Sequence, residues 1–325
     1  MPTVEQNRQQ WNQDYEWTKQ GEEWSAVWGG SEAQWFGAIL PRIHAFVPTG
    51  TILEIAPGFG RWTAYLKKHC ESLAVVDLAE ECIKACQKRF ASDSHISYYV
   101  NDGKSLAMIQ DKSIDFVFSF DSLVHAEAEV IEAYLNQLAM KLSPNGIGFI
   151  HHSNLGKYQQ VFSLIDNIPS EMRGLVVNKI FLAPTHWRAG SMTAELFADY
   201  CDQSGLRCVS QELVNWGTDE LLIDCFSLFT PKNSIWARPN NVIENKDFMK
   251  EAILIKQLSP LYTLKSFQSS REANMIEGQP VDATLRLNAT AMKPVSPRIW
   301  SRSLRWILDR CRQSQTVQGH DRVPR

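Results

Sequence analysis

The stretch TILEIAPGFGRW at residues 51–62 runs from an apolar segment through a glycine-rich bend into a segment with helical character. We interpret residues 51–56 as a strand, the part around Gly58 and Gly60 as the bend, and the residues from Arg61 onward as the start of a helix. Glycines at such a bend let the backbone approach a ligand, and the free N–H groups of the following helix favour an anionic group. The stretch therefore predicts an anion-binding bend at the end of a strand.

Short apolar runs alternate with helical segments from this point to residue 152. Further strands are predicted at 73–78, 96–100, 113–120 and 146–152, helices at 61–70, 79–91 and 128–142, and a turn at 144–146. This alternation specifies a parallel sheet with crossover helices. Two later extended stretches, 207–216 and 220–231, have no helix between them and indicate an antiparallel pair at one sheet edge. The fold class expected is α/β, a doubly wound, Rossmann-like sheet.

Composition and the predicted secondary structure divide the chain into three parts. Residues 1–48 hold five of the eleven tryptophans and predict a helical, aromatic-rich cap, which either packs on the next part or covers a pocket in it. Residues 49–231 form the expected α/β domain. Residues 232–325 form a C-terminal extension with a helix near 247–258 and an Arg-rich amphipathic stretch from residue 298, which would dock within the protein, in a homodimer or on an anionic membrane.

Composition excludes several classes of protein. The 325 residues carry 33 Lys and Arg against 36 Asp and Glu, so there is no protein-wide basic field for nucleic acid. No apolar run reaches the roughly 18 residues that span a bilayer, and the N-terminus is too polar for a signal peptide, so we expect a cytoplasmic protein. Seven scattered cysteines without a C-x-x-C pair indicate neither a disulfide framework nor a zinc site.

An acidic residue, Asp77, ends the second predicted strand. A carboxylate at this position can accept hydrogen bonds from two ribose hydroxyls, so the bend and Asp77 together indicate a nucleoside cofactor. A dinucleotide fold expects a third glycine where this chain has Thr63, which weakens the NAD interpretation.

The stretch EIAPGFGR resembles the acid-x-Gly-x-Gly-x-Gly loop of class I S-adenosylmethionine (AdoMet) methyltransferases, with Glu54 as the acid and Ala56 in place of the first glycine. VVDLAEECIKAC, VNDGKSL, DFVFSFDSLVHAE and LSPNGIGFIHHSN resemble later segments of that family, in order, over residues 51–155 and more loosely to 231. The resemblance implies a seven-stranded sheet with its last strand antiparallel, AdoMet as cofactor and S-adenosylhomocysteine (AdoHcy) as product. It implies that Asp77 binds the ribose and that Asp102 binds the adenine amino group. The cofactor-binding residues that we expect are Glu54, Ala56, Gly58, Gly60, Arg61, Asp77, Leu78, Asp102, Gly103 and Phe120.

Candidate catalytic residues follow the fourth and fifth strands, because ligands in doubly wound sheets bind beyond the carboxyl ends of the strands. A hydroxyl acceptor must lose its proton, which favours a histidine base. His125 is the first candidate, and Asp121 would orient it or bind substrate. Side chains alternate along a strand, so one of the pair at 151 and 152 should face the pocket, and we prefer His152. His186 is a weaker candidate.

The expected function is methyl transfer from AdoMet to a hydroxyl of a small molecule or glycan, with the cap, residues 185–191 and Trp216 lining the acceptor pocket. Three alternatives stay open: an N-methyltransferase acting on a small molecule, an NAD(P)-dependent oxidoreductase, and a non-catalytic AdoMet-binding partner of another enzyme. We expect no metal cofactor. The alternative there is a divalent cation held by Asp121, His125, His152 and Asp224.

Overall fold

The computed structural model describes residues 3–160, 163, 187–217 and 221–261. The chain divides into two compact units, Met1–Ser270 and Arg271–Arg325, and every described residue belongs to the first. The prediction for His186 and that for the amphipathic stretch from residue 298 fall outside the described residues.

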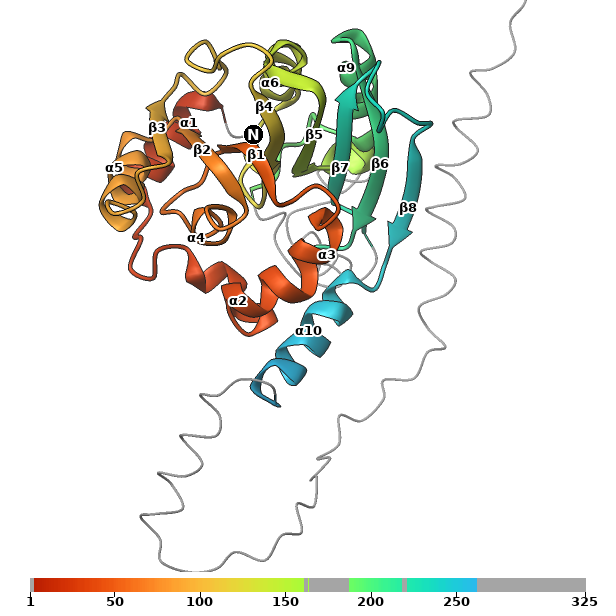
Figure 1. The fold of residues 1–325 in the computed structure, drawn as a ribbon. Coiled ribbons are helices and arrows are strands. Elements are labelled where there is room, and N and C mark those ends of the chain that lie inside the picture. The colour runs from red at the N-terminus through yellow and green to blue at the C-terminus, as the bar shows by residue number, and fades with distance from the viewer. Residues whose placement is uncertain (1–2, 161–162, 164–186, 218–220, 262–325) are drawn as a thin grey trace, which may run out of the picture. The chain divides into compact units, whose positions relative to one another are not determined.

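One mixed sheet organises this unit (Figure 1), with the strand order β3-β2-β1-β4-β5-β7-β6-β8 among the described residues. Its strands are β1 (Thr49–Ile55), β2 (Cys70–Asp77), β3 (Ile96–Val100), β4 (Ile114–Ser119), β5 (Leu142–Ser153), β6 (Leu206–Val214), β7 (Asp224–Pro231) and β8 (Asn241–Asn245). The first five strands pair in parallel, and β7 is antiparallel to both β5 and β6. The predicted Rossmann-like α/β class with an antiparallel last strand is therefore confirmed.

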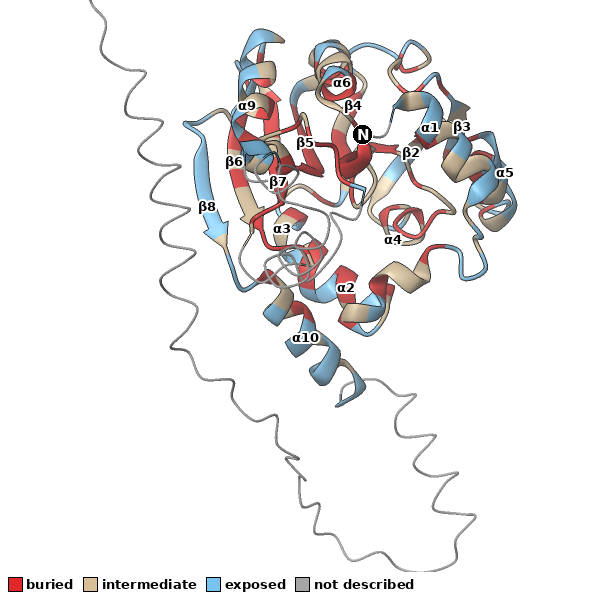
Figure 2. Ribbon diagram, turned by 180° about the vertical axis from the view of Figure 1, so that it is seen from behind, coloured by how far each residue is buried: buried red, intermediate tan, exposed pale blue. Residues whose placement is uncertain are grey.

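The sheet has one strand more than the seven predicted. β8 pairs in parallel with the edge strand β6, in a stretch for which the sequence predicted a loop. Four of its five residues are exposed, and Figure 2 shows it as the pale outer strand of the sheet. Because β8 buries neither face, it lacks the alternating apolar pattern by which a strand is recognised in a sequence.

Helices and helical turns cover both faces of the sheet. The α-helices are α1 (Val4–Gln9), α2 (Ser31–Gln34), α3 (Leu40–Ile43), α4 (Thr63–Leu66), α5 (Glu80–Arg89), α6 (Ala128–Lys141), α9 (Ala194–Gln203) and α10 (Phe248–Leu258). The 3₁₀ and π helices are η1 (Gln10–Asp14), η2 (Glu22–Trp28), η3 (Trp35–Ile39), η4 (Leu123–His125), η5 (Leu155–Tyr158) and η6 (Ser259–Leu261). No helix among these residues combines the length and the apolar character that crossing a bilayer requires.

The core forms two layers because side chains alternate across each strand. On β4, Phe116 and Phe118 pack in the layer that also holds Trp28 and Trp35, whereas Val117 packs in the layer of α6 and α9. The region 144–146, predicted as a turn, lies within β5, where the pairing with β4 has an irregular register. This arrangement brings the carboxyl ends of the neighbouring strands β1, β2 and β4 together at one end of the sheet.

Candidate active site

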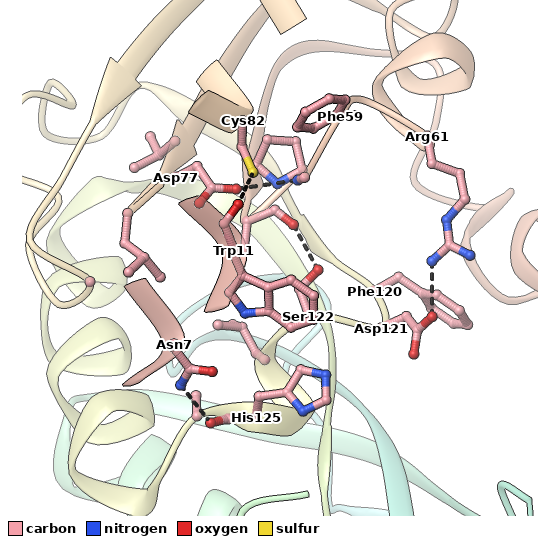
Figure 3. Close-up of a pocket in the computed structure, with 18 of the residues that line it drawn as sticks. Asn7, Trp11, Phe59, Arg61, Asp77, Cys82, Phe120, Asp121, Ser122 and His125 are labelled. Carbon is pink, nitrogen blue, oxygen red and sulfur yellow. Dashed lines mark hydrogen bonds and ion pairs between the residues drawn. The ribbon is translucent and has the colours of Figure 1, made fainter. Parts of the chain in front are cut away.

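A cavity opens where β1, β2 and β4 end, and Figure 3 shows part of its lining. The parallel register places Ile55 beside Val76 and Glu54 beside Phe118, so the segments that leave these three strands meet. The cavity is lined from the sheet side by residues 56–59, 61 and 62, by Asp77 and Leu78, by Gly103 and by residues 120–123 and 125.

Residues 56–61, here called the bend, include three residues with a left-handed backbone conformation. Ala56, Gly58 and Gly60 all have positive φ, at 58°, 58° and 81°. The N–H of Ala56 donates to the carbonyl of Val76 (2.8 Å), and the Ser122 hydroxyl donates to the carbonyl of Ala56 (2.7 Å). A Cβ on Gly60 would lie 2.5 Å from Cε2 of Phe90. Glycine at residue 60 is therefore required by both conformation and space.

Asp77 links the bend to the second strand. Its carboxylate accepts the N–H of Gly58 (3.2 Å) through Oδ2 and the N–H of Ala79 (2.8 Å) through Oδ1. Burial raises the pKa of Asp77 to about 6. Each carboxylate oxygen retains a lone pair toward the cavity side, so Asp77 can accept further hydrogen bonds from a ligand.

Glu54 lies beneath the bend and is fully buried. One oxygen accepts the Thr63 hydroxyl (2.6 Å), and the other, Oε1, has no hydrogen-bond partner in the described part of the chain. Burial raises the pKa of Glu54 to about 8. Thr63 thus makes a structural bond at the position where a dinucleotide fold would have its third glycine.

An ion-pair network borders the cavity at Asp121. Its carboxylate pairs with Arg61 (2.9 Å) and approaches Arg188 (3.9 Å), and Arg188 pairs with the buried Asp224 (2.8 Å). Burial opposes ionisation of Asp224, but Arg188 and His151 hold its pKa well below the usual range. The network couples the loop after β4 to β7.

His151 fixes the backbone of Asp121, which has a φ of 63°. The N–H of Asp121 donates to Nδ1 of His151 (3.1 Å), so the proton of the neutral ring is on Nε2, which donates to Asp224 (3.0 Å). With both ring nitrogens engaged, His151 positions this loop and has no free lone pair for a substrate.

His125 presents an open nitrogen to the cavity. Its Nδ1 donates to the carbonyl of Trp187 (2.9 Å), because a carbonyl can only accept, and this leaves a lone pair on Nε2. No described residue bonds to Nε2. Burial, with Arg188 nearby, lowers the pKa of His125 to about 4, so the ring is neutral near pH 7.

His152 does not reach the cavity, which corrects the sequence-based preference. Its ring stacks on Phe197 with centroids 4.4 Å apart, and its nitrogens bond to the Ser153 carbonyl and the Ser227 hydroxyl, each at 2.8 Å. His151, on the other face of β5, contacts the cavity-lining Phe120 and bonds to the backbone of Asp121, but it is not among the cavity-lining residues either. In the described residues, no group of three or more His, Cys, Asp or Glu side chains could hold a metal ion.

Asp102 also lies outside the cavity. Its carboxylate is exposed and accepts the N–H groups of Lys104 (2.9 Å) and Ser105 (2.7 Å), which close its own turn. These bonds lower its pKa. The neighbouring Gly103 does line the cavity, as does Leu78. In this structure Asp102 is not among the cavity-lining residues, whereas the family resemblance implies that it contacts the adenine.

Residues 4–24, here called the cover, close the cavity from the opposite side. Trp17 stacks on Phe59 with ring centroids 4.3 Å apart, and its Cη2 lies 2.8 Å from where a Cβ on Gly58 would be. Trp11 contacts the ring of His125, with centroids 5.5 Å apart. The cavity-lining residues of the cover are Val4, Asn7, Trp11, Trp17, Gln20 and Trp24.

Sequence reasoning missed several of these positions. Arg188 belongs to the stretch 185–191 and His151 to the histidine pair that the sequence singled out, but the ion pair of the one and the backbone contact of the other depend on geometry that the sequence does not show. The cover was expected as a cap, but nothing in its sequence singled out Asn7. Tryptophan content was the available signal for the cover, and it indicated neither which rings line the cavity nor which residue contributes a polar group.

Residues 52–146 match a family model described as a methyltransferase domain. The chain is 29% identical over 119 residues to phosphoethanolamine N-methyltransferase 1 of Triticum aestivum, covering 35% of this chain and 24% of that protein. It is 37% identical over 64 residues to ribosomal RNA small subunit methyltransferase A of Coxiella burnetii, covering 20% of this chain and 24% of that protein. The chain therefore spans about a quarter of the length of these relatives.

Among solved structures, an S-adenosylmethionine-dependent methyltransferase from Clostridium acetobutylicum is similar, with a TM-score of 0.45 and 14% identity. The match covers 64% of this chain and 92% of that one. Residues 52–146 are thus similar to a methyltransferase domain.

Proposed function

We propose, on the premise of a methyltransferase domain at residues 52–146, that this protein transfers a methyl group from AdoMet to a hydroxyl of a small molecule or glycan. One observation carries the proposal: the bend, Asp77 and the open Nε2 of His125 belong to the same cavity. A nucleoside held by the first two would therefore lie within reach of a proton acceptor.

The residues of this edge fit AdoMet. The bend carries no side chain at Gly58 or Gly60, so a ligand that displaced the Trp17 ring from Gly58 could approach the backbone closely. Asp77 offers its remaining lone pairs to the ribose hydroxyls. Arg61, the last residue of the bend, lies buried between Trp24 and Trp62 and pairs with Asp121, and its positive charge would attract the carboxylate of the ligand.

Bound AdoMet supplies an electrophilic methyl carbon on its sulfonium, and the protein must align the acceptor atom with it. In this proposal His125 accepts the acceptor's hydroxyl proton at Nε2, while the bond from Nδ1 to the Trp187 carbonyl keeps the ring in the required tautomer. Asp121 is held by Arg61 and by the His151 contact, and it borders the space for the acceptor. Trp11 closes that space from the cover and excludes water.

A second candidate, methyl transfer to an amine, is favoured by the pKa of His125. At about 4 this pKa makes the imidazole a weak base for a hydroxyl proton. A neutral amine already carries a lone pair, and it needs from His125 only acceptance of an N–H hydrogen bond. The two candidates differ in how much of the rate depends on His125.

The test is a screen of hydroxylated sugars, phenols, alcohols and small amines with isotopically labelled AdoMet, read by mass spectrometry of the methylated product. For a hydroxyl acceptor, His125→Ala should lower kcat by about 10²–10⁴-fold and leave the KM for AdoMet unchanged. An amine acceptor should lose less than about tenfold. His44→Ala, at an exposed histidine, is the matched control and should match wild type. A hydroxyl acceptor methylated at full rate by His125→Ala would contradict the assignment of the base.

A further inference from the structure

Helix α1 of the cover lies against the loop that follows β3. A Cβ on Gly103 would lie 2.8 Å from Cγ1 of Val4 and 3.7 Å from Cβ of Leu78, so these residues meet at one end of the cavity. Arg8 donates to the carbonyl of Asp102 (3.4 Å). Asn7 follows Val4 by three positions, so both side chains lie on one face of α1. Asn7, one turn along α1 from Val4, lines the same cavity as Gly103 and Leu78.

The amide of Asn7 is oriented by one hydrogen bond. Its Nδ2 donates to the carbonyl of His125 (3.0 Å). If the amide group were rotated by 180°, its Oδ1 would face the His125 carbonyl oxygen, and neither atom could donate. This orientation leaves Oδ1 as an acceptor on a side chain that is 8% exposed. Oδ1 is buried without a hydrogen-bond partner among the described residues. A buried acceptor without a partner is costly, so a ligand that donates a hydrogen bond there is favoured.

Several other residues of the cavity lining are apolar. Leu78, Ala126 and Val130 line the cavity with apolar side chains, and the Asp102 carboxylate is turned toward its own loop. The unpartnered Oδ1 of Asn7 thus supplies an acceptor to a cavity to which Asp102 supplies none.

We propose that Asn7 Oδ1 accepts a hydrogen bond from the exocyclic amino group of the cofactor's adenine, so that the cover, and not the loop after β3, recognises the base. This inference rests on the proposed function, because it takes the ligand to be an adenine nucleoside. The amino group donates a hydrogen bond, no covalent bond forms or breaks, and no proton is transferred. The contact links recognition of the base to closure of the cover, since Asn7 and Trp11 belong to the same segment.

The experiment measures affinity for two ligands by calorimetric titration: AdoHcy, and S-inosylhomocysteine, in which a carbonyl oxygen replaces the amino group. Wild type should bind AdoHcy at least about tenfold more tightly, because the carbonyl cannot donate to Oδ1. Asn7→Ala should reduce this ratio to near one by weakening AdoHcy binding alone. Asn7→Leu, which preserves the side-chain volume, should behave like Asn7→Ala. Asp102→Asn is the control and should keep the wild-type ratio.

Thermal unfolding of each variant establishes that it is folded before titration. Equal weakening of both ligands in Asn7→Ala and Asn7→Leu would overturn the inference, because it would mean that Asn7 only holds the cover in place. A lost ratio in Asp102→Asn would overturn it in favour of Asp102. An unchanged ratio with a raised KM for the methyl acceptor would overturn it in favour of an acceptor contact. If wild type bound neither ligand, the proposed function itself would fail.

Discussion

The bend and the cover face each other across one cavity, but they are held in different ways. The bend is fixed by hydrogen bonds that its backbone N–H groups donate, from Ala56 to the Val76 carbonyl and from Gly58 to the Asp77 carboxylate. The cover is held mainly by contacts between partly exposed rings, with Trp11 at their centre. The difference indicates a division of labour, in which the sheet edge provides a rigid platform and the cover provides a surface that can separate from it.

The largest effect expected from this contrast comes from two tryptophans that lie eleven residues apart. Trp28, just beyond the cover, is buried against Trp216 and Phe248, and Trp28→Ala should lower the free energy of unfolding by about 3–5 kcal/mol. Trp17, which stacks on the bend, is partly exposed, and Trp17→Ala should cost about 1 kcal/mol of stability. It should instead weaken AdoHcy binding by about tenfold, a cost of roughly 1.4 kcal/mol. Urea unfolding and calorimetric titration measure the two quantities, and equal loss of stability in both variants would remove the distinction.

How much of each region could be predicted from the sequence follows from the same difference. The bend was predictable because strand periodicity, paired glycines and the acid at Asp77 are local signals with a direct structural meaning. The phase of β5, which decides between His151 and His152, was not, because both positions are buried and the sequence alternation is equally satisfied by either. Asp102 was placed by resemblance alone, and the bonds to its own turn are a local choice that a motif does not reveal. Asn7 acquires its place only through the packing of α1.

The next largest effect on stability is expected from the close packing around Gly60. Gly60→Ala should lower the free energy of unfolding by about 2–4 kcal/mol, because the new methyl group meets Phe90 and the left-handed backbone disfavours a side chain. Gly205→Ala is a matched control: its φ is 85°, but nothing lies within 4 Å of the added Cβ. It should cost about 1–2 kcal/mol from conformation alone. Equal losses in urea unfolding would mean that the bend is not tightly packed.

The pH dependence of cofactor binding tests the role of Asp77 beside the bend. Its raised pKa of about 6 means that the carboxylate gains a proton as the pH falls through 6, and a protonated carboxyl accepts ribose hydroxyls poorly. Affinity for AdoHcy should therefore fall by up to about tenfold per pH unit below pH 6 and level off above it. Asp77→Asn should bind more weakly at neutral pH and lose this dependence. A wild-type affinity that stays constant between pH 5 and 8 would contradict the role of Asp77.

The smallest effect is expected at Ala56, where a side chain occupies a left-handed backbone conformation with φ at 58°. Ala56→Gly removes this strain but adds freedom to the unfolded chain, so the net gain in stability should stay within about 1 kcal/mol. AdoHcy affinity should remain within a few-fold of wild type. Thermal and urea unfolding measure the gain. Destabilisation by more than this amount would show that the Ala56 methyl group contributes packing to the bend.

The most direct test of the central claim is calorimetric titration of the wild-type protein and of Asp77→Ala with AdoHcy and, separately, with NAD. Wild type should bind one AdoHcy per chain, folded Asp77→Ala should bind it at least about a hundredfold more weakly, and NAD should give no binding heat. Absence of AdoHcy binding to wild type, or unchanged affinity in Asp77→Ala, would contradict the claim.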